Sequence, residues 1–191
     1  MMSVSGHKIG APKGIGFLYK KKNIAIAPLI YGGKQEFGLR GGTENVPYIV
    51  ALGMAVALLS KIDAISQDYL KELRDHLIDS ILQTIPESYI VGDLKDRLCN
   101  NVCVCIPGIA SSSLVSLLDM RGFCVSSGSA CTSNTTKASH VLDAIGLSME
   151  DQHSCIRISL GSDNTLDDIN KFVDALEKSI STINRMKNSD Y

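Results

Sequence analysis

The amino-acid sequence predicts a chain of the α/β class, and two observations carry this prediction. From residue 89 onward, short apolar runs alternate with helical patterns, and residues 155–160 alternate apolar and polar side chains as a half-buried strand does. In addition, 45% of the 191 residues are hydrophobic and 20% are charged. Such a composition provides enough apolar surface for a packed core and excludes global disorder.

The first part of the chain is rich in glycine. We expect the end of a strand over residues 2–5, a tight turn over 6–16 and a short strand over 17–19. An apolar stretch over residues 24–30 and a glycine-rich loop over 32–45 then follow. A helix follows to about Ser60, because Pro47 suits a first turn and Asn45 is a candidate N-cap. This helix is apolar nearly all round, so we expect it to promote association. Because the chain enters a specialised turn almost at once, we also expect further sequence upstream.

The rest of the chain shows the alternation of helices and strands. Helices are expected over residues 65–85, from Ser111 or Ser112 to Gly122, over 137–145 and from Thr165 onward, and strands over 89–91, 101–106, 123–125 and 155–160. Pro86 would stop the first of these helices. Asp168 is placed like the acid of a capping box that begins the last helix.

Charge and cysteine content restrict the class of protein. A net charge of −1 argues against a general nucleic-acid binder, although residues 1–45 carry seven Lys and Arg against two Glu. No secretory leader is recognised, and the longest apolar run, residues 46–59, is too short to span a membrane. Six cysteines without a secretion signal then predict reduced thiols and a cytoplasmic location. Because no CxxC pair occurs, we expect no resident metal ion.

The first candidate site lies in the segment SGHKIGAPKG, residues 5–14. A lysine held between tight glycine turns and partly removed from water can act as a nucleophilic amine. We therefore single out Lys8, with His7 beside it. The alternative interpretation is an ordinary surface lysine in a loop.

The second candidate is Cys131 in the segment VSSGSACTS. Its neighbours are small and polar, so the thiol is expected to be exposed on a mobile loop where its thiolate could react. By contrast, inert buried positions are expected for Cys103, Cys105, Cys124 and Cys155.

The third candidate is Arg157, which stands between Ile156 and Ile158 in an apolar strand. A guanidinium group there is costly unless it is paired. It either forms a partly buried salt bridge with an acid such as Asp163, or it binds a substrate carboxylate as a two-pronged donor.

Four segments, SGHKIGAPKGIGFLY, GGKQEFGLRGGTEN, SSGSACTS and RISLGSDNT, resemble in this order those of one enzyme family. They are similar to the pyridoxal-phosphate (PLP) cysteine desulfurases of the NifS/IscS type in the class-V aminotransferase family, from residue 3 to about 186. The resemblance implies the C-terminal part of a PLP fold-type-I, aspartate-aminotransferase-like enzyme. Residues 1–62 would be the end of the PLP-binding large domain with a bridging helix, and residues 63–191 a complete small α/β domain with the cysteine loop.

The resemblance also implies residue roles. Lys8, after His7, would bind PLP as a Schiff base, and Thr43 would reach the cofactor phosphate of the other subunit in a homodimer. Arg157 would bind the carboxylate of L-cysteine. Cys131 would accept its sulfur as a persulfide while alanine leaves, and could ligate an iron–sulfur cluster transiently. The sulfur would then pass to an acceptor or iron–sulfur scaffold protein, for cluster or thio-cofactor synthesis.

The chain departs from the family pattern in one respect. Most of the family's cofactor-binding residues, including an aspartate at the pyridine nitrogen and a phosphate-binding turn, precede the lysine and are absent from this sequence. We therefore expect little or no activity from this chain alone. Two alternatives stay open: a non-catalytic remnant or split subunit that needs an upstream half, and a PLP enzyme like selenocysteine lyase, against which the long polar loop around Cys131 argues.

Overall fold

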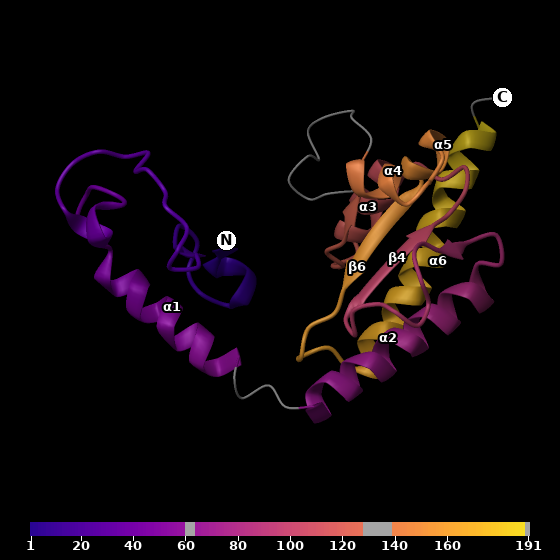
Figure 1. Cartoon of the computed structure of the whole chain (residues 1–191). Coiled ribbons are helices and arrows are strands. Elements are labelled where there is room, and N and C mark those ends of the chain that lie inside the picture. The colour runs from indigo at the N-terminus through magenta and orange to yellow at the C-terminus, as the bar shows by residue number, and fades with distance from the viewer. Residues whose placement is uncertain (60–63, 128–138, 190–191) are drawn as a thin grey trace. The chain divides into compact units, whose positions relative to one another are not determined.

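A computed structural model describes residues 1–59, 64–127 and 139–189, and it combines helices with β-sheets, as predicted. The chain divides into two units, Met1–Asp63 and Ala64–Tyr191, each with hydrophobic clusters of its own (Figure 1). None of the helices in the described residues is long and apolar enough to cross a membrane.

The first unit opens with an antiparallel hairpin of β1 (Met2–Ser5) and β2 (Gly16–Tyr19). The 3-10 helix η1 (Gly6–Ile9) follows β1 directly, and the Gly6 N–H donates to the Ile15 carbonyl at 2.8 Å. A β-carbon on Gly6 would lie only 2.8 Å from that carbonyl oxygen. The close approach of the two backbone segments therefore requires glycine at this position.

The helix α1 (Val46–Leu59) begins as the sequence predicts. The Tyr48 N–H donates to the side-chain Oδ1 of Asn45 at 3.4 Å, and Pro47 occupies the first turn. A small cluster links this helix to the segment around η1 and consists of Ile9, Ala11, Ile15, Leu52 and Ala55. Most other apolar side chains of α1 are exposed, which agrees with its all-round apolar sequence. A second 3-10 helix, η2 (Gln35–Gly38), lies in the glycine-rich loop before it.

The second unit is built on a four-stranded antiparallel sheet in the order β3–β4–β6–β5. The strands are β3 (Tyr89–Ile90), β4 (Asn101–Cys105), β5 (Ser126–Ser127) and β6 (Cys155–Ser159), and the helices are α2 (Ala64–Thr84), α3 (Ser111–Asp119), α4 (His140–Ala144), α5 (Met149–Gln152) and α6 (Leu166–Ser189). The two long helices, α2 and α6, pack against each other and, with α3, cover one face of the sheet (Figure 1).

The alternation of side chains gives the two central strands different faces. One face joins the large core with the long helices and carries Val102, Val104, Ile156 and Ile158. The opposite face carries Cys103, Cys105, Cys155 and Arg157. Leu142 of α4 packs on this second face beside Val91, in a small cluster that contains Cys105 and Cys155.

The last helix begins with the predicted capping box. The Thr165 N–H donates to Asp168 Oδ2 at 2.9 Å, and the Asp168 N–H donates back to Thr165 Oγ1 at 3.2 Å. The buried stripe of α6 consists of Ile169, Phe172, Leu176, Ile180 and Ile183.

Two expected elements are corrected. Neither serine caps α3 with its side chain: Ala110 is the N-cap, and the Ser111 N–H donates to the His153 carbonyl at 2.8 Å. The strand expected over residues 123–125 lies instead at Ser126–Ser127. The Phe123 ring packs edge-on against Phe172, with ring centroids 5.5 Å apart, so the apolar residue that suggested a strand is used for helix packing.

Two short helices also differ from expectation. The helix expected over residues 137–145 begins at His140, with Ser139 as its N-cap, while residues 137–138 lie outside the described part of the chain. The helix α5 has no counterpart among the elements expected from the sequence. Its signal is the pair Ser148 and Asp151, in which the Asp151 N–H donates to the serine Oγ at 3.1 Å and the hydroxyl donates to the carboxylate at 2.9 Å.

Candidate active site

Lys8 and His7 lie in η1, at the turn between β1 and β2. Gly6 is buried, and its carbonyl accepts the Ala11 N–H at 3.0 Å, which holds the turn closed. Both His7 and Lys8 are exposed. The expectation that Lys8 is partly removed from water is therefore wrong for this chain. The buried residue of η1 is Gly6, which has no side chain, whereas the Lys8 side chain points to solvent.

Thr43 is placed by a second close approach of backbone segments. The Gly41 N–H donates to the Ile30 carbonyl at 2.9 Å, and a β-carbon on Gly41 would come within 2.9 Å of Gly32. Gly42 then turns the chain with a φ of +106°, a value that favours glycine. Thr43 follows with its side chain exposed, where a hydroxyl can meet a ligand.

Arg157 lies on β6, the strand between β4 and β5. Its cross-strand neighbours are Cys103 and Ser126. Within the described residues it forms no ion pair with Asp163, so the salt-bridge interpretation is wrong there. Its Nε is buried and has no hydrogen-bond partner among the residues that the structure describes. A buried donor without a partner is rare and costly, so this guanidinium group retains binding capacity for a ligand.

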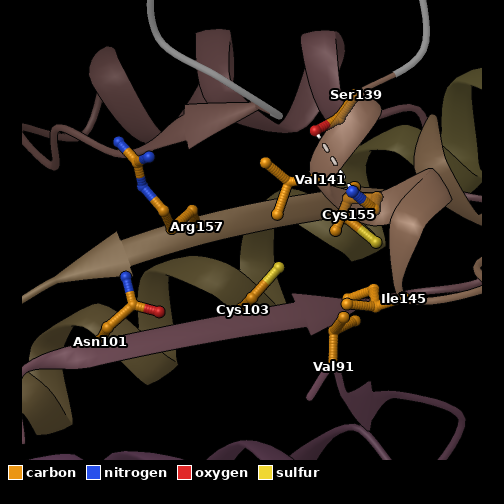
Figure 2. Close-up of a pocket in the computed structure, with 9 residues that line it drawn as sticks. Val91, Asn101, Cys103, Ser139, Val141, Ile145, Cys155 and Arg157 are labelled. Carbon is orange, nitrogen blue, oxygen red and sulfur yellow. Dashed lines mark hydrogen bonds between the residues drawn. The ribbon is translucent and has the colours of Figure 1, made fainter. Parts of the chain in front are cut away.

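A pocket of about 190 Å³ opens beside this arginine (Figure 2). It is lined by Val91, Asn101, Cys103, Ser139, Val141, Leu142, Ile145, Cys155 and Arg157. Figure 2 shows Cys103 and Asn101 on β4 and Arg157 and Cys155 on β6, so most of the polar and thiol groups come from the two central strands. The N-cap of α4, Ser139, adds a hydroxyl group. The remaining wall is largely aliphatic and excludes water from part of the site.

The thiols on this face are linked to one another. Cys155 and Cys105 both donate to the Asp151 carbonyl, at 3.1 and 3.5 Å. When Cys103 is ionised, the single thiol proton of Cys155 can turn from the Asp151 carbonyl to the Cys103 sulfur, and this hydrogen bond lowers the pKa of Cys103. Burial opposes the shift, and the positive charges of Arg97 and Arg157 add to it. The same bond and burial raise the pKa of Cys155. Cys103 is therefore the member of the group that most readily forms a thiolate.

The cysteine assignments made from the sequence hold only in part. Cys105 and Cys155 are buried, as predicted. Cys103 is half-buried and faces the pocket, and Cys124 is exposed, so the inert core positions predicted for these two are wrong. Cys131 lies outside the described residues.

The structure thus describes two sets of candidate residues. His7, Lys8 and Thr43 belong to the first unit, and Arg157 belongs to the second, with the pocket thiols that sequence reasoning did not select. The alternation of residues 101–105 indicates from sequence alone that Cys103 and Cys105 share a face of the strand, but only the pairing of β4 with β6 brings Cys103 opposite Arg157.

Comparisons with known proteins agree on one family. A family model for class-V aminotransferases matches residues 1–172. The chain is 41% identical over 186 residues to the cysteine desulfurase IscS of Methanosarcina thermophila, covering 97% of this chain and 46% of that protein. A cysteine desulfurase of Archaeoglobus fulgidus is also 41% identical, with 97% of this chain and 48% of that protein covered. The chain spans about half the length of the curated relatives it matches.

Solved structures give the same result. A NifS-like protein from Rickettsia africae superposes with a TM-score of 0.83 at 36% identity, covering 94% of this chain and 47% of that one. The protein SspA, solved in complex with cysteine, superposes with a TM-score of 0.57 at 35% identity, covering 83% of this chain and 43% of that one.

Proposed function

Because this chain belongs to the class-V aminotransferase family, we propose that it works as part of a cysteine desulfurase. In this proposal L-cysteine is the substrate, L-alanine is one product, and Cys131 receives the sulfur as a persulfide. The similarity to curated cysteine desulfurases over 97% of the chain supports the proposal. The chain covers about half of the length of those relatives, and the complete reaction would also need residues that correspond to their other half.

The two units would divide the work. Residues 1–62 would be the end of the PLP-binding large domain with its bridging helix, and residues 63–191 the small domain with the cysteine loop. Thr43 would contact the cofactor phosphate of the second subunit in a homodimer. A sulfur-acceptor or iron–sulfur scaffold protein would then take the persulfide sulfur from Cys131.

The residues of the first unit fit part of a PLP site. Lys8 presents an exposed amine, which is the group that an aldehyde captures, and Thr43 presents an exposed hydroxyl, which can donate to a phosphate. When bound, PLP would supply an electron sink for bond changes at the substrate Cα. The fit is incomplete within this chain, and the remaining contacts would come from segments outside it.

The chain's own residues would perform three tasks. Arg157 would hold the substrate carboxylate through its two-pronged guanidinium group. Lys8 would carry the proton from the substrate Cα. The Cys131 thiolate would attack the substrate sulfur, so that a new S–S bond forms while the substrate C–S bond breaks and its electrons stay with the departing alanine carbon, which gains a proton.

One observation in the structure supports this arrangement most directly. Ser126, the first residue of the SSGSACTS segment, lies directly opposite Arg157 in the paired strands β5 and β6. Cys131 follows the end of β5 by four residues, and an extended chain of that length spans at most about 14 Å. The start of the proposed cysteine loop therefore lies beside the proposed carboxylate anchor, which supports the proposed roles of Cys131 and Arg157.

The proposal is tested first at Lys8. The chain is incubated with PLP, reduced with borohydride and digested, and the pyridoxyl group is located by mass spectrometry. We expect the label on Lys8 in excess over Lys13, a second lysine in the same glycine-rich segment. Lys8→Ala should remove the label, whereas Lys13→Ala should leave it. Equal labelling of the two lysines would contradict the role of Lys8.

The second test follows the sulfur. With PLP and L-cysteine, we expect the chain alone to form alanine at a small fraction of the rate of a full-length desulfurase. Trapping with an alkylating reagent should locate any persulfide on Cys131, and Cys131→Ser should abolish it, while Cys124→Ser should not. A rate equal to that of a full-length desulfurase would contradict the expected dependence on further segments.

A second candidate function requires no catalysis by this chain. In it the chain is a non-catalytic or split subunit that only accepts sulfur on Cys131. Such a chain would gain the Cys131 persulfide from a separate desulfurase loaded with cysteine, and Lys8→Ala would not affect that gain. Loss of the persulfide in Lys8→Ala would instead favour the enzyme.

A further inference from the structure

The pocket beside Arg157 contains a thiol to which the proposed desulfurase reaction assigns no task. Cys103 of β4 lines this pocket and is half-buried, so its sulfur can meet a small reagent. The two other thiols of the cluster are closed off, because Cys155 is 1% exposed and Cys105 is 0% exposed. Access therefore selects Cys103 among the three.

The electrostatic surroundings of Cys103 favour its thiolate. Cys155 shares a hydrogen bond with it, and Arg157 lies opposite it on β6. Arg97 adds a second positive charge in the neighbourhood. Reactive cysteines are found in electropositive and partly accessible surroundings of this kind.

The pocket also restricts the ligand. Its volume of about 190 Å³ is below the range of roughly 300–1,000 Å³ that holds drug-sized molecules, so the ligand has only a few heavy atoms. The buried Nε of Arg157 has no partner among the described residues, and a carboxylate is the group that a guanidinium donor recognises best. The Asn101 amide in the same wall adds a further polar group.

We propose that Cys103 is a thiol-modification site that exchanges with small disulfides bearing a carboxylate, with Arg157 as the anchor for that carboxylate. The Cys103 thiolate attacks one sulfur of the disulfide. A new S–S bond forms between Cys103 and that half, the original S–S bond breaks, and the other half leaves as a thiolate that takes up a proton. The Cys103 sulfur is oxidised and the departing sulfur is reduced, so the disulfide itself is the oxidant.

The modification would occupy the arginine. A carboxylate tethered through Cys103 would hold the Arg157 guanidinium and exclude another carboxylate from it. In the proposed desulfurase, disulfide stress would thus block the substrate anchor without touching Cys131. This consequence rests on the proposed function, whereas the modification itself does not.

The test compares two disulfides on the full chain without PLP. Dithiodiglycolate carries carboxylates, and hydroxyethyl disulfide is a neutral compound of similar size. The rate of mixed-disulfide formation is measured at each cysteine by quenched peptide mapping. At Cys103 we expect dithiodiglycolate to react at least about tenfold faster, because a charge-assisted hydrogen bond to Arg157 is formed. At the exposed Cys124, an internal control, the two rates should agree within about twofold.

Two variants locate the anchor. The preference at a cysteine is the ratio of its rate with dithiodiglycolate to its rate with hydroxyethyl disulfide. Arg157→Gln should lower this ratio at Cys103 to about its value at Cys124. Arg157→Lys, which keeps the charge, should retain part of the higher ratio at Cys103. An unmodified Cys103, or a Cys103 without preference in the unaltered chain, would overturn the proposal. If Arg157→Gln does not fold, the comparison of Cys103 with Cys124 in the unaltered chain still decides. Because the readout is a mass on Cys103, its failure leaves the proposed desulfurase function untouched.

Discussion

At the scale of single residues, two glycines shape the turns that carry His7, Lys8 and Thr43. Gly6 allows η1 to pack against the Ile15 carbonyl, and η1 displays His7 and Lys8 at the turn between β1 and β2. Gly41 allows its own backbone segment and that of Gly32 to approach closely in the loop before Thr43. Neither glycine takes part in the proposed reaction. Each is required because a β-carbon at its position would collide with a backbone atom.

The first residue-scale prediction concerns Gly6. Gly6→Ala should lower the free energy of local opening around η1 by about 1–3 kcal/mol, because the added methyl group meets a backbone oxygen that cannot move aside easily. Hydrogen exchange of the Ala11 amide, which is bonded to the Gly6 carbonyl, measures this change. Gly53→Ala in α1 is the control: its β-carbon meets nothing within 4 Å, so it should stabilise the helix by roughly 0.5–1 kcal/mol. Unchanged exchange at Ala11 in Gly6→Ala would refute the steric argument.

At the scale of elements, α6 depends on its first turn. The reciprocal bonds of Thr165 and Asp168 satisfy backbone N–H groups that the helix cannot satisfy itself. Thr165→Ala should reduce the stability of the second unit by about 1 kcal/mol, as measured by denaturant unfolding. Asp174→Asn, an exposed change in the middle of the same helix, should alter stability by less than about 0.5 kcal/mol.

The capping box of Thr165 and Asp168 also predicts that the stability of the second unit depends on pH. The hydrogen bond from the Thr165 N–H lowers the pKa of Asp168 below its ordinary value of 3.8. A carboxyl whose pKa is lower in the folded state stabilises the fold above the unfolded pKa, and this contribution is lost as the pH falls through the folded pKa. The stability difference between the chain and Asp168→Asn should thus be constant at neutral pH and shrink below about pH 3.8. A difference that persists unchanged into strong acid would contradict the carboxylate's role.

At the scale of the whole molecule, the exposed apolar surface of α1 is the main feature. Val50 is 65% exposed and Met54 is 61% exposed, in a helix with only two buried residues. We expect the chain to self-associate with rising concentration in light scattering, because apolar area of this kind is removed from water on association. Met54→Lys should weaken the association. Met186→Lys in α6, where the methionine is 59% exposed, is the matched control and should not. A monodisperse monomer at all concentrations would refute this expectation.

Local sequence signals predicted much of the architecture. Asn45 and Pro47 marked the start of α1, Thr165 and Asp168 marked that of α6, and the alternation around Arg157 placed it on a strand. Two of the failures have the same physical origin. Phe123 looked like a strand residue but packs on a helix, and Ser111 looked like a cap but is buried against another segment. In each case a partner distant in the sequence outweighs the local preference.

By itself, the sequence determined the long helices α1, α2 and α6, the alternation of side chains on the strand that carries Arg157, and the membership of His7, Lys8 and Thr43 in glycine-rich turns. These features depend on caps, periodicity and glycine, which act over a few residues. Only the tertiary structure decided that Cys103 and Ser126 flank Arg157, that the Arg157 Nε has no partner in the described part of the chain and that Cys103 faces a pocket. Strand register joins residues of β4 and β6 that are fifty or more positions apart in the sequence, and no local pattern encodes which residues will meet across the two strands.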